Sequence, residues 1–506
     1  MSNSRVKNVI LNSYFGVISQ LSIIALNFIT RTFFIMYLGK SYLGLNGLFT
    51  NILTLFSLAE LGLGTAIVYS LYKPIAEKDY QKVFSYIKYY KKIYIRISLI
   101  VLLLGLIFLP FLNQIITEKD IKYIHWIFLI FLANSVCSYM YAHYRSLVIA
   151  HQKEFLISKI RLVLSFIKAF FQIGSLYFFQ SFLLFLTIQV IITFLENLLV
   201  FFKGKNLLKK FQVEDKELPS IEKSEIWKNV KSLMLYKIGG TLLDTTDQII
   251  ISIFLGVLIL GEVSNYILII SAVSIILFQI FNSITASVGN FIVKENKVDQ
   301  KNLLYSLTLV THFLYGFSFI LLYYLVNPII EIWIGSEYVI EKKIVSFMFI
   351  NWYIAGMMNS IWIFRTNMGL FKYGQYRPII SAIINLILSL VGVKFFGLIG
   401  VFLATTITRL ITNVWFDPLV VFKYGFSEKP YKFYYTWFNY VFITLVSLIL
   451  SDFLLNLSGI KHLKYTYVFC GITINLIFFV AFTLILKIKS SEMNFFKNKF
   501  NFIFKK

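Results

Sequence analysis

Long apolar segments follow one another along the whole chain, separated by short clusters of charge, glycine or proline. Most contain about 20 or more predominantly apolar residues, the length that an α-helix needs to cross a bilayer. About fourteen spans are expected from this pattern, near residues 11–38, 46–72, 93–113, 123–148, 158–179, 182–202, 232–255, 262–291, 304–327, 344–371, 377–396, 398–421, 434–454 and 465–487. The pattern therefore predicts an all-α integral membrane protein.

The composition excludes several other classes of protein. Charged residues make up 14% of the 506 residues and apolar residues 58%, whereas soluble domains carry roughly 25% charged residues. Cys137 and Cys470 both lie inside apolar segments, so a disulfide scaffold is not expected. The histidines lack metal-ligand spacing and no glycine-rich nucleotide loop is present, so neither a metal centre nor an ATP-driven pump is predicted.

Basic residues set the expected orientation. With the N-terminus in the cytoplasm, about 34 of the 48 Lys and Arg residues fall on the inner side and about 8 on the outer side. Both termini are therefore predicted to be cytoplasmic. The net charge of +24 is then explained by topology and by anionic membrane lipids, and no nucleic-acid partner is expected. The first span has no small-residue cleavage site and is expected to be retained.

Two halves of the chain share a pattern displaced by 217 positions. Leu38-Gly39 and Leu43-Gly44 recur as Leu255-Gly256 and Leu260-Gly261, and Phe178-Phe179 recurs as Phe395-Phe396. Six spans per repeat is an even number, so the repeats should be parallel, with a transporter-like cavity between them. The predicted organisation is a six-helix lobe (1–202), a cytoplasmic linker (203–231), a second six-helix lobe (232–422), two additional transmembrane helices (434–488) and a basic-aromatic cytoplasmic tail (489–506).

Basic residues near the span ends are counted with the loops, Arg161 with a cytoplasmic loop. Six others fall inside the predicted spans: Arg31, Arg145, Lys168, Lys237, Arg365 and Arg409. A charge in the bilayer is costly, so each should face a cavity or a partner, or reach back to the interface. Arg145, Lys237 and Arg365 lie nearer the cytoplasmic ends of their spans. For these three, snorkelling to the inner interface is at least as good an explanation as contact with a ligand. Arginine also binds phosphate through two hydrogen bonds. The predicted substrate-binding residues are Arg31, Glu60, Lys168, Arg365 and Arg409, with an Arg31–Glu60 ion pair as the alternative for Glu60.

Acidic residues inside the spans predict a second kind of site. Asp244 and Asp247 lie three residues apart, on one helical face. Two close carboxylates repel each other in a low dielectric, so a proton or a cation should accompany them. The predicted site for a coupling Na⁺ or H⁺ combines them with Asn385, Ser389 and Thr405. In the alternative, the two acids pair with Lys237 or Arg409. Glu196 is expected to pair with a basic residue near the inner face.

Several longer stretches resemble one family. GLNGLFTNILTLFSLAELGLGTAI (44–67), TTDQIIIS (245–252), FRTNMGLFKYGQYRPII (364–380) and FGLIGVFLATTITR (396–409) are similar to Wzx-type oligosaccharide flippases of the polysaccharide transporter family. That family belongs to the multidrug/oligosaccharidyl-lipid/polysaccharide (MOP) flippase superfamily. The resemblance covers nearly the whole chain. It departs at RSLVIAHQK (145–153), where His151 stands in place of an expected acid.

The resemblance implies a MATE-like fold, with two six-helix lobes in a V and two further helices. It also implies transport of undecaprenyl-diphosphate-linked oligosaccharide from the cytoplasmic to the outer leaflet, by alternating access, for capsule, O-antigen or cell-wall polysaccharide. Arg31, Arg365 and Arg409 would hold the diphosphate. The expected setting is the bacterial cell membrane, with the chain a monomer that meets membrane lipids, a polysaccharide polymerase and glycosyltransferases.

Three alternatives remain at this stage. A lipid II flippase or a drug exporter of the same superfamily would share the architecture, although exporters of cationic drugs need an acidic cavity. A membrane-embedded polysaccharide polymerase would need a large outer loop with catalytic residues. The longest predicted outer loop has about sixteen residues, so an enzyme is not expected.

Overall fold

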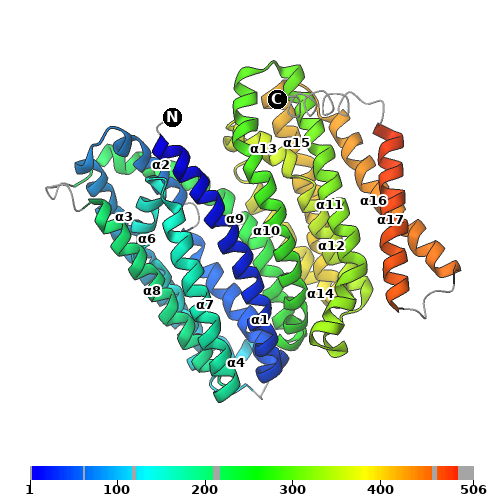
Figure 1. Ribbon diagram of the computed structural model, residues 1–506, viewed down its shortest axis with the longest axis horizontal. Coiled ribbons are helices and arrows are strands. Elements are labelled where there is room, and N and C mark those ends of the chain that lie inside the picture. Colours follow the sequence, from blue (N-terminus) through cyan, green and yellow to red (C-terminus); the bar gives the residue numbers. More distant parts are fainter. Residues whose placement is uncertain (1–2, 61–62, 117–120, 209–216, 459–463, 488–506) are drawn as a thin grey trace. The chain divides into compact units, whose positions relative to one another are not determined.

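The computed structural model describes residues 3–60, 63–116, 121–208, 217–458 and 464–487, and within these ranges all regular structure is helical (Figure 1). The helices are α1 (Asn3–Phe56), η1 (Ser57–Glu60), α2 (Leu63–Ala76), α3 (Tyr80–Phe108), η2 (Leu109–Phe111), α4 (Leu112–Ile115), α5 (Ile124–Tyr139), α6 (Ala142–Ala150), α7 (Glu154–Phe179), α8 (Phe182–Leu208), α9 (Ser220–Leu255), α10 (Val257–Lys294), α11 (Lys297–Ile334), η3 (Ser336–Tyr338), α12 (Lys342–Gly356), α13 (Asn359–Asn367), η4 (Leu370–Lys372), α14 (Arg377–Arg409), η5 (Leu410–Val414), α15 (Trp415–Val420), η6 (Val421–Phe426), α16 (Tyr431–Leu457) and α17 (Lys464–Lys487).

The helices are those of a multi-pass membrane protein. In the described ranges, 11 helices are long and apolar enough to cross a membrane, or 12 if the bent pair α5 and α6 forms one span. Two of them, Leu11–Phe56 with 46 residues and Arg377–Phe426 with 50 residues, are far longer than the roughly 20 residues that one crossing needs. Each contains a glycine with positive φ, Gly39 (φ 76°) and Gly397 (φ 57°), where the chain turns. These two turns, together with the bent pair α5 and α6 counted as one span, account for the difference from the fourteen predicted crossings.

Helix boundaries repeat along the chain with the displacement of 217 positions that the sequence indicated. The starts of α1 and α9, Asn3 and Ser220, are related in this way, as are the starts of α3 and α11, Tyr80 and Lys297. Short helices α6 and α13 match at both ends. The internal repeat is therefore visible in the secondary structure itself.

Backbone conformation repeats as well. Three pairs of residues with positive φ are each 217 positions apart: Gly39 and Gly256, Gln152 and Gly369, and Gln180 and Gly397. Positive φ is rare outside glycine, so three coincidences at one displacement support a repeated chain path.

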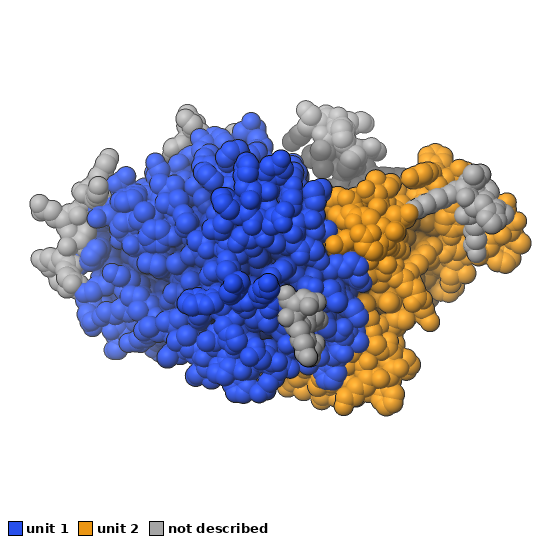
Figure 2. All heavy atoms as spheres, turned by 90° about the horizontal axis from the view of Figure 1, so that it is seen from below, with its two compact units in different colours: residues 1–264 blue, residues 265–506 orange. Residues whose placement is uncertain are grey.

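The chain forms two compact units, residues 1–264 and 265–506, coloured separately in Figure 2. The division falls inside α10, since α9 and the start of α10 pack with α1 in the first unit. In the predicted linker at 203–231, α8 continues to Leu208 and α9 begins at Ser220. Residues 209–216 of that linker and the predicted tail at 489–506 lie outside the described residues.

Within the first unit, α1 and the start of α10 cross with their backbones in contact. A Cβ atom on Gly44 would lie 1.7 Å from the carbonyl oxygen of Val257, and one on Gly261 would lie 2.5 Å from that of Lys40. The two contacts are related by the repeat, because 44 corresponds to 261 and 40 to 257. Lys40 also pairs with Glu262 at 2.8 Å. Only glycine permits this approach.

We expect Gly44→Ala to lower the melting temperature of the purified protein in detergent. Its Cβ would overlap a backbone oxygen, and overpacking typically costs about 1–3 kcal/mol or more. Gly174→Ala is the matched control, because nothing lies within 4 Å of its Cβ position in α7. Alanine is the better helix former, so this variant should melt at the wild-type temperature or slightly above it. Equal melting of the two variants would contradict the close crossing.

Candidate functional site

Two apolar spans of the first unit are interrupted along their length. In the second span, α1 ends at Phe56, a 3₁₀ turn covers Ser57–Glu60, and α2 begins at Leu63. In the fourth span, α5 and α6 meet at a 40° bend with Tyr141 at φ 64°. Broken helices at membrane depth are tolerated where they line a cavity, and they mark binding sites in transporters.

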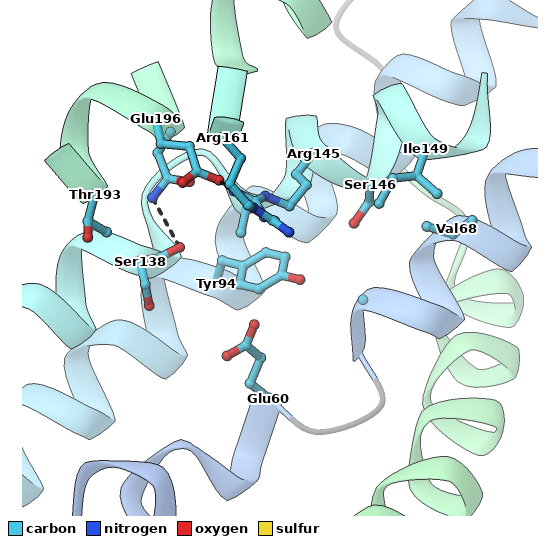
Figure 3. Close-up of a pocket in the computed structure, with 13 residues that line it drawn as sticks. Glu60, Val68, Tyr94, Ser138, Arg145, Ser146, Ile149, Arg161, Thr193 and Glu196 are labelled. Carbon is cyan, nitrogen blue, oxygen red and sulfur yellow. Dashed lines mark hydrogen bonds and ion pairs between the residues drawn. The ribbon is translucent and has the colours of Figure 1, made fainter. Parts of the chain in front are cut away.

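A cavity of about 710 Å³ adjoins both breaks, within the usual size range of ligand pockets. We call it the arginine cavity (Figure 3). It is lined by Glu60, Gly64, Val68, Tyr94, Ser138, Ala142, Arg145, Ser146, Ile149, Arg161, Thr193, Glu196 and Asn197.

Three charged side chains from three helices meet at one wall of the arginine cavity. The Oε1 atom of Glu196 lies 2.5 Å from Nη2 of Arg145 and 3.4 Å from Nε of Arg161. The exposed fractions of the side chains are 29% for Arg145, 41% for Arg161 and 19% for Glu196, so the cluster is accessible. At this wall two guanidinium groups share one carboxylate, and Glu60 places a second carboxylate elsewhere in the lining.

Much of the remaining cavity lining is polar, and Asn197 is held in place by hydrogen bonds to the backbone. Asn197 donates to the carbonyl oxygens of Cys137 (2.9 Å) and Ser138 (3.4 Å), which lie at the end of α5. It thereby satisfies backbone groups near the break. Figure 3 shows the Tyr94 side chain between Glu60 and Arg145, with the Glu60 carboxylate directed towards it. Hydroxyl groups of Tyr94, Ser138, Ser146 and Thr193 complete a wall that can hydrogen-bond to oxygen-rich ligands.

Of the predicted substrate-binding residues in the first unit, Glu60 lines the arginine cavity. Arg31 lies on α1 and donates to the hydroxyl and the carbonyl oxygen of Ser264, both at 3.4 Å. Lys168 is half-buried on α7, within electrostatic range of Glu196. Their roles in binding stay predictions.

In the second unit, Arg365 belongs to a buried ionic cluster. Its guanidinium pairs with Asp417 and donates to the carbonyl oxygen of Tyr373 at 2.7 Å. Nε of Arg377 lies 3.3 Å from Asp417, and Arg377 also donates to Asn413. The exposed fractions of the Arg365 and Asp417 side chains are 2% and 0%, so the structure gives Arg365 protein partners. Binding of substrate by Arg365, and by the half-buried Arg409 at the end of α14, stays a prediction.

The predicted cation ligands are found in both units. Asn385 donates to Thr405 at 2.8 Å and to Ser389 at 3.3 Å, so these three buried residues do come together. Asp247 is buried on α9 of the first unit, and the side chain of Asp244 lies outside the described residues. In the part of the chain that the structure describes, no three or more His, Cys, Asp or Glu side chains are grouped to hold a metal. Joint action of the acids and the second-unit trio stays a prediction.

Sequence reasoning missed the central role of Arg145 and Arg161. Arg161 was assigned to a cytoplasmic loop, whereas it lies within α7 and lines the cavity. The expectation that Glu196 pairs with a basic residue is confirmed. A comparison of the repeats would have found the cavity, since the positions equivalent to Glu60 and Glu196 hold Leu277 and Asn413.

Comparison with known proteins identifies the fold. No family model and no curated protein sequence matches the chain. Among solved structures it is similar to the lipid II flippase MurJ in an inward closed conformation, with 18% identity, coverage of 94% of this chain and 98% of that one, and a TM-score of 0.64. It is similar to a point mutant of the Vibrio cholerae MATE transporter VcmN, with 15% identity, coverage of 84% and 98%, and a TM-score of 0.60.

A third similar structure is the inward-facing conformation of a multidrug resistance MATE family transporter of the MOP superfamily. It shows 12% identity, coverage of 79% of this chain and 96% of that one, and a TM-score of 0.57. At these identities the comparisons establish the fold. The expected all-α, MATE-like fold of the MOP transporters is confirmed.

Proposed function

We propose that this chain is a flippase that moves undecaprenyl-diphosphate-linked oligosaccharide from the cytoplasmic to the outer leaflet of a bacterial cell membrane. The observation that carries the proposal is the arginine cavity, in which Arg145 and Arg161 face a space at two broken membrane spans. The MATE-like fold supports a transport role, and the similar MurJ structure is that of a lipid II flippase.

The chemistry of the cavity favours an anion with several oxygen atoms. Placing positively charged guanidinium groups inside a membrane span costs free energy. An anionic ligand would offset that cost by compensating the charge. Arg161 touches Glu196 only through Nε, and its terminal nitrogens make no hydrogen bond within the residues that the structure describes. Arg145 and Arg161 lie on adjacent helices and share one carboxylate. A diphosphate offers enough acceptors for both forked donors.

The uncharged part of the lining suits sugar. Tyr94 offers an aromatic body with a hydroxyl, and Ser138, Ser146 and Thr193 offer further hydroxyl groups. In the proposed complex the diphosphate lies on the arginines and the first sugar residues lie against this wall. The isoprenoid chain stays in the bilayer, because lipid tails are as apolar as leucine side chains and nothing is gained by moving it onto the protein.

Transport is proposed to proceed by alternating access between two six-helix lobes, coupled to Na⁺ or H⁺. Asp244 and Asp247 in one unit, and Asn385, Ser389 and Thr405 in the other, are the proposed coupling residues. A cation biases the exchange only if it binds one state better than the other. Arg31, Arg365 and Arg409 are retained as proposed secondary contacts, and Lys168 as a residue that supports substrate binding. The chain is proposed to act as a monomer with cytoplasmic termini.

The test is the leaflet distribution of the glycolipid in cells with and without this chain. We expect the lipid-diphosphate-linked oligosaccharide to accumulate on the cytoplasmic face in cells that lack the chain, and re-expression to restore its outer exposure. An unchanged distribution in cells that also lack other flippases would contradict the proposal.

Lipid II is a second candidate substrate, favoured by the similarity to MurJ. It shares the diphosphate and differs in the attached sugars and peptide. Supplying both glycolipids in the same assay separates the two substrates. Export of cationic drugs is less well supported, because Arg145 already neutralises Glu196 at 2.5 Å.

A further inference from the structure

Lys168 is a charged side chain in an unusual position. It lies in the middle of α7, seven residues after Arg161 and therefore on the same helical face. Within the part of the chain that the structure describes, it makes no hydrogen bond or ion pair, although Glu196 is within electrostatic range. An ammonium group inside a membrane span needs a compensating partner, so one should form in another state of the protein.

Glu196 has capacity for such a partner. Both of its contacts, with Arg145 and with Arg161, use Oε1. Its Oε2 atom makes no hydrogen bond within the described residues. A carboxylate has about four acceptor positions, so Glu196 can turn towards another donor without first losing every contact.

The internal repeat shows that the charges of Lys168 and Glu196 are particular to the first repeat. At the displacement of 217 positions, Lys168 corresponds to Asn385 and Glu196 to Asn413. Both second-repeat residues are neutral amides that serve as local hydrogen-bond partners, Asn385 to Thr405 and Asn413 to Arg377. The first repeat thus has one positive and one negative charge at positions where the second has two neutral amides with separate partners.

We propose that Glu196 alternates between the arginine pair and Lys168, and that an anionic ligand drives the exchange. In the empty cavity, Glu196 is ion-paired with Arg145 and Arg161. When the diphosphate binds the two arginines, Glu196 turns to Lys168, so that its charge stays paired. Glu196 is then a built-in competitor of the ligand, and Lys168 is the positioning residue that receives it. This inference rests on the proposed function, because it takes the ligand group to be a diphosphate.

The test is a double-mutant cycle on the purified full-length protein in detergent, with inorganic pyrophosphate as the probe and calorimetry as the readout. Glu196→Gln should bind pyrophosphate about tenfold more tightly, because the competing anion is gone. Lys168→Gln should bind about tenfold more weakly, because the displaced Glu196 has no partner. In the Glu196→Gln background, Lys168→Gln should change the affinity by less than about twofold. The difference between the effects of Lys168→Gln in the two backgrounds measures the coupling expected of an interacting pair.

Glu262→Gln is the matched control, since Glu262 is also ion-paired in the first unit, with a side-chain exposure of 27%, but lies outside the arginine cavity. Its affinity for pyrophosphate should equal that of the wild type. All variants should melt at similar temperatures.

The outcomes separate two failures. If the wild type does not bind pyrophosphate, the proposed diphosphate site is wrong. If the wild type binds but Lys168→Gln weakens binding equally in both backgrounds, Lys168 acts on the ligand directly and the exchange is overturned. Unchanged affinity for pyrophosphate in Glu196→Gln would also overturn the exchange, because it would show that Glu196 does not compete with the ligand in the wild type.

Discussion

Replacing Arg145 with glutamine is expected to reduce transport of lipid-diphosphate-linked oligosaccharide roughly 100-fold, because a hydrogen bond to a charged group typically contributes about 1.5–3 kcal/mol. Arg145 is the residue that links the break at α6 to Glu196, and its guanidinium faces the cavity. The rate of glycolipid movement between leaflets of reconstituted vesicles measures the effect directly. Membrane levels of the variant should stay normal, since the side chain is 29% exposed.

Two further variants show whether charge or geometry matters. Arg145→Lys keeps the charge but loses the planar fork, so transport should fall by only about tenfold. Arg96→Gln is the matched control, because Arg96 is an exposed arginine on α3 that does not line the cavity, and it should transport normally. Wild-type transport by well-expressed Arg145→Gln would remove Arg145 from the site.

The second large effect is expected on stability. Asp417→Asn should lower the free energy of unfolding by about 3–5 kcal/mol, because Arg365 and Arg377 would be left buried without their counter-charge. Unfolding of the purified protein by a denaturing detergent measures this loss. Removing the charge of Glu196 in the arginine cavity by Glu196→Gln should cost much less, since that cluster is partly exposed. Equal losses would contradict the distinction between a buried structural cluster and an open binding cluster.

The repeat was largely predictable from sequence because its turns use glycine. Leu-Gly pairs at Gly39 and Gly256 reveal positions of positive φ. The other two turns pair a glycine with a glutamine, Gln152 with Gly369 and Gln180 with Gly397. Glutamine carries no such signal. The recurrence of Phe178-Phe179 as Phe395-Phe396 indicated the turn at Gln180, whereas the match of Gln152 to Gly369 needed the backbone.

The candidate site was less predictable, because it depends on pairing between distant helices. Hydrophobic pattern shows that Arg145, Glu196 and Arg365 lie within spans, but not which carboxylate each arginine meets. The break after Tyr139 contains neither proline nor glycine, so nothing local marks it, whereas Gly62 is a local signal for the break after Phe56. By contrast, Asn385, Ser389 and Thr405 were grouped into one predicted site from sequence, and Asn385 does donate to both Ser389 and Thr405.

The central claim is that this chain itself moves diphosphate-linked glycolipid across a bilayer. The measurement that tests it most directly uses the purified wild-type chain in vesicles, with two fluorescent glycolipids that carry the same oligosaccharide, one through a diphosphate and one through an uncharged linkage. The account predicts rapid exchange of the diphosphate-linked lipid between leaflets and only the protein-free rate for the uncharged one. Equal rates for both lipids, or no movement of the diphosphate-linked lipid under any ion gradient, would contradict it.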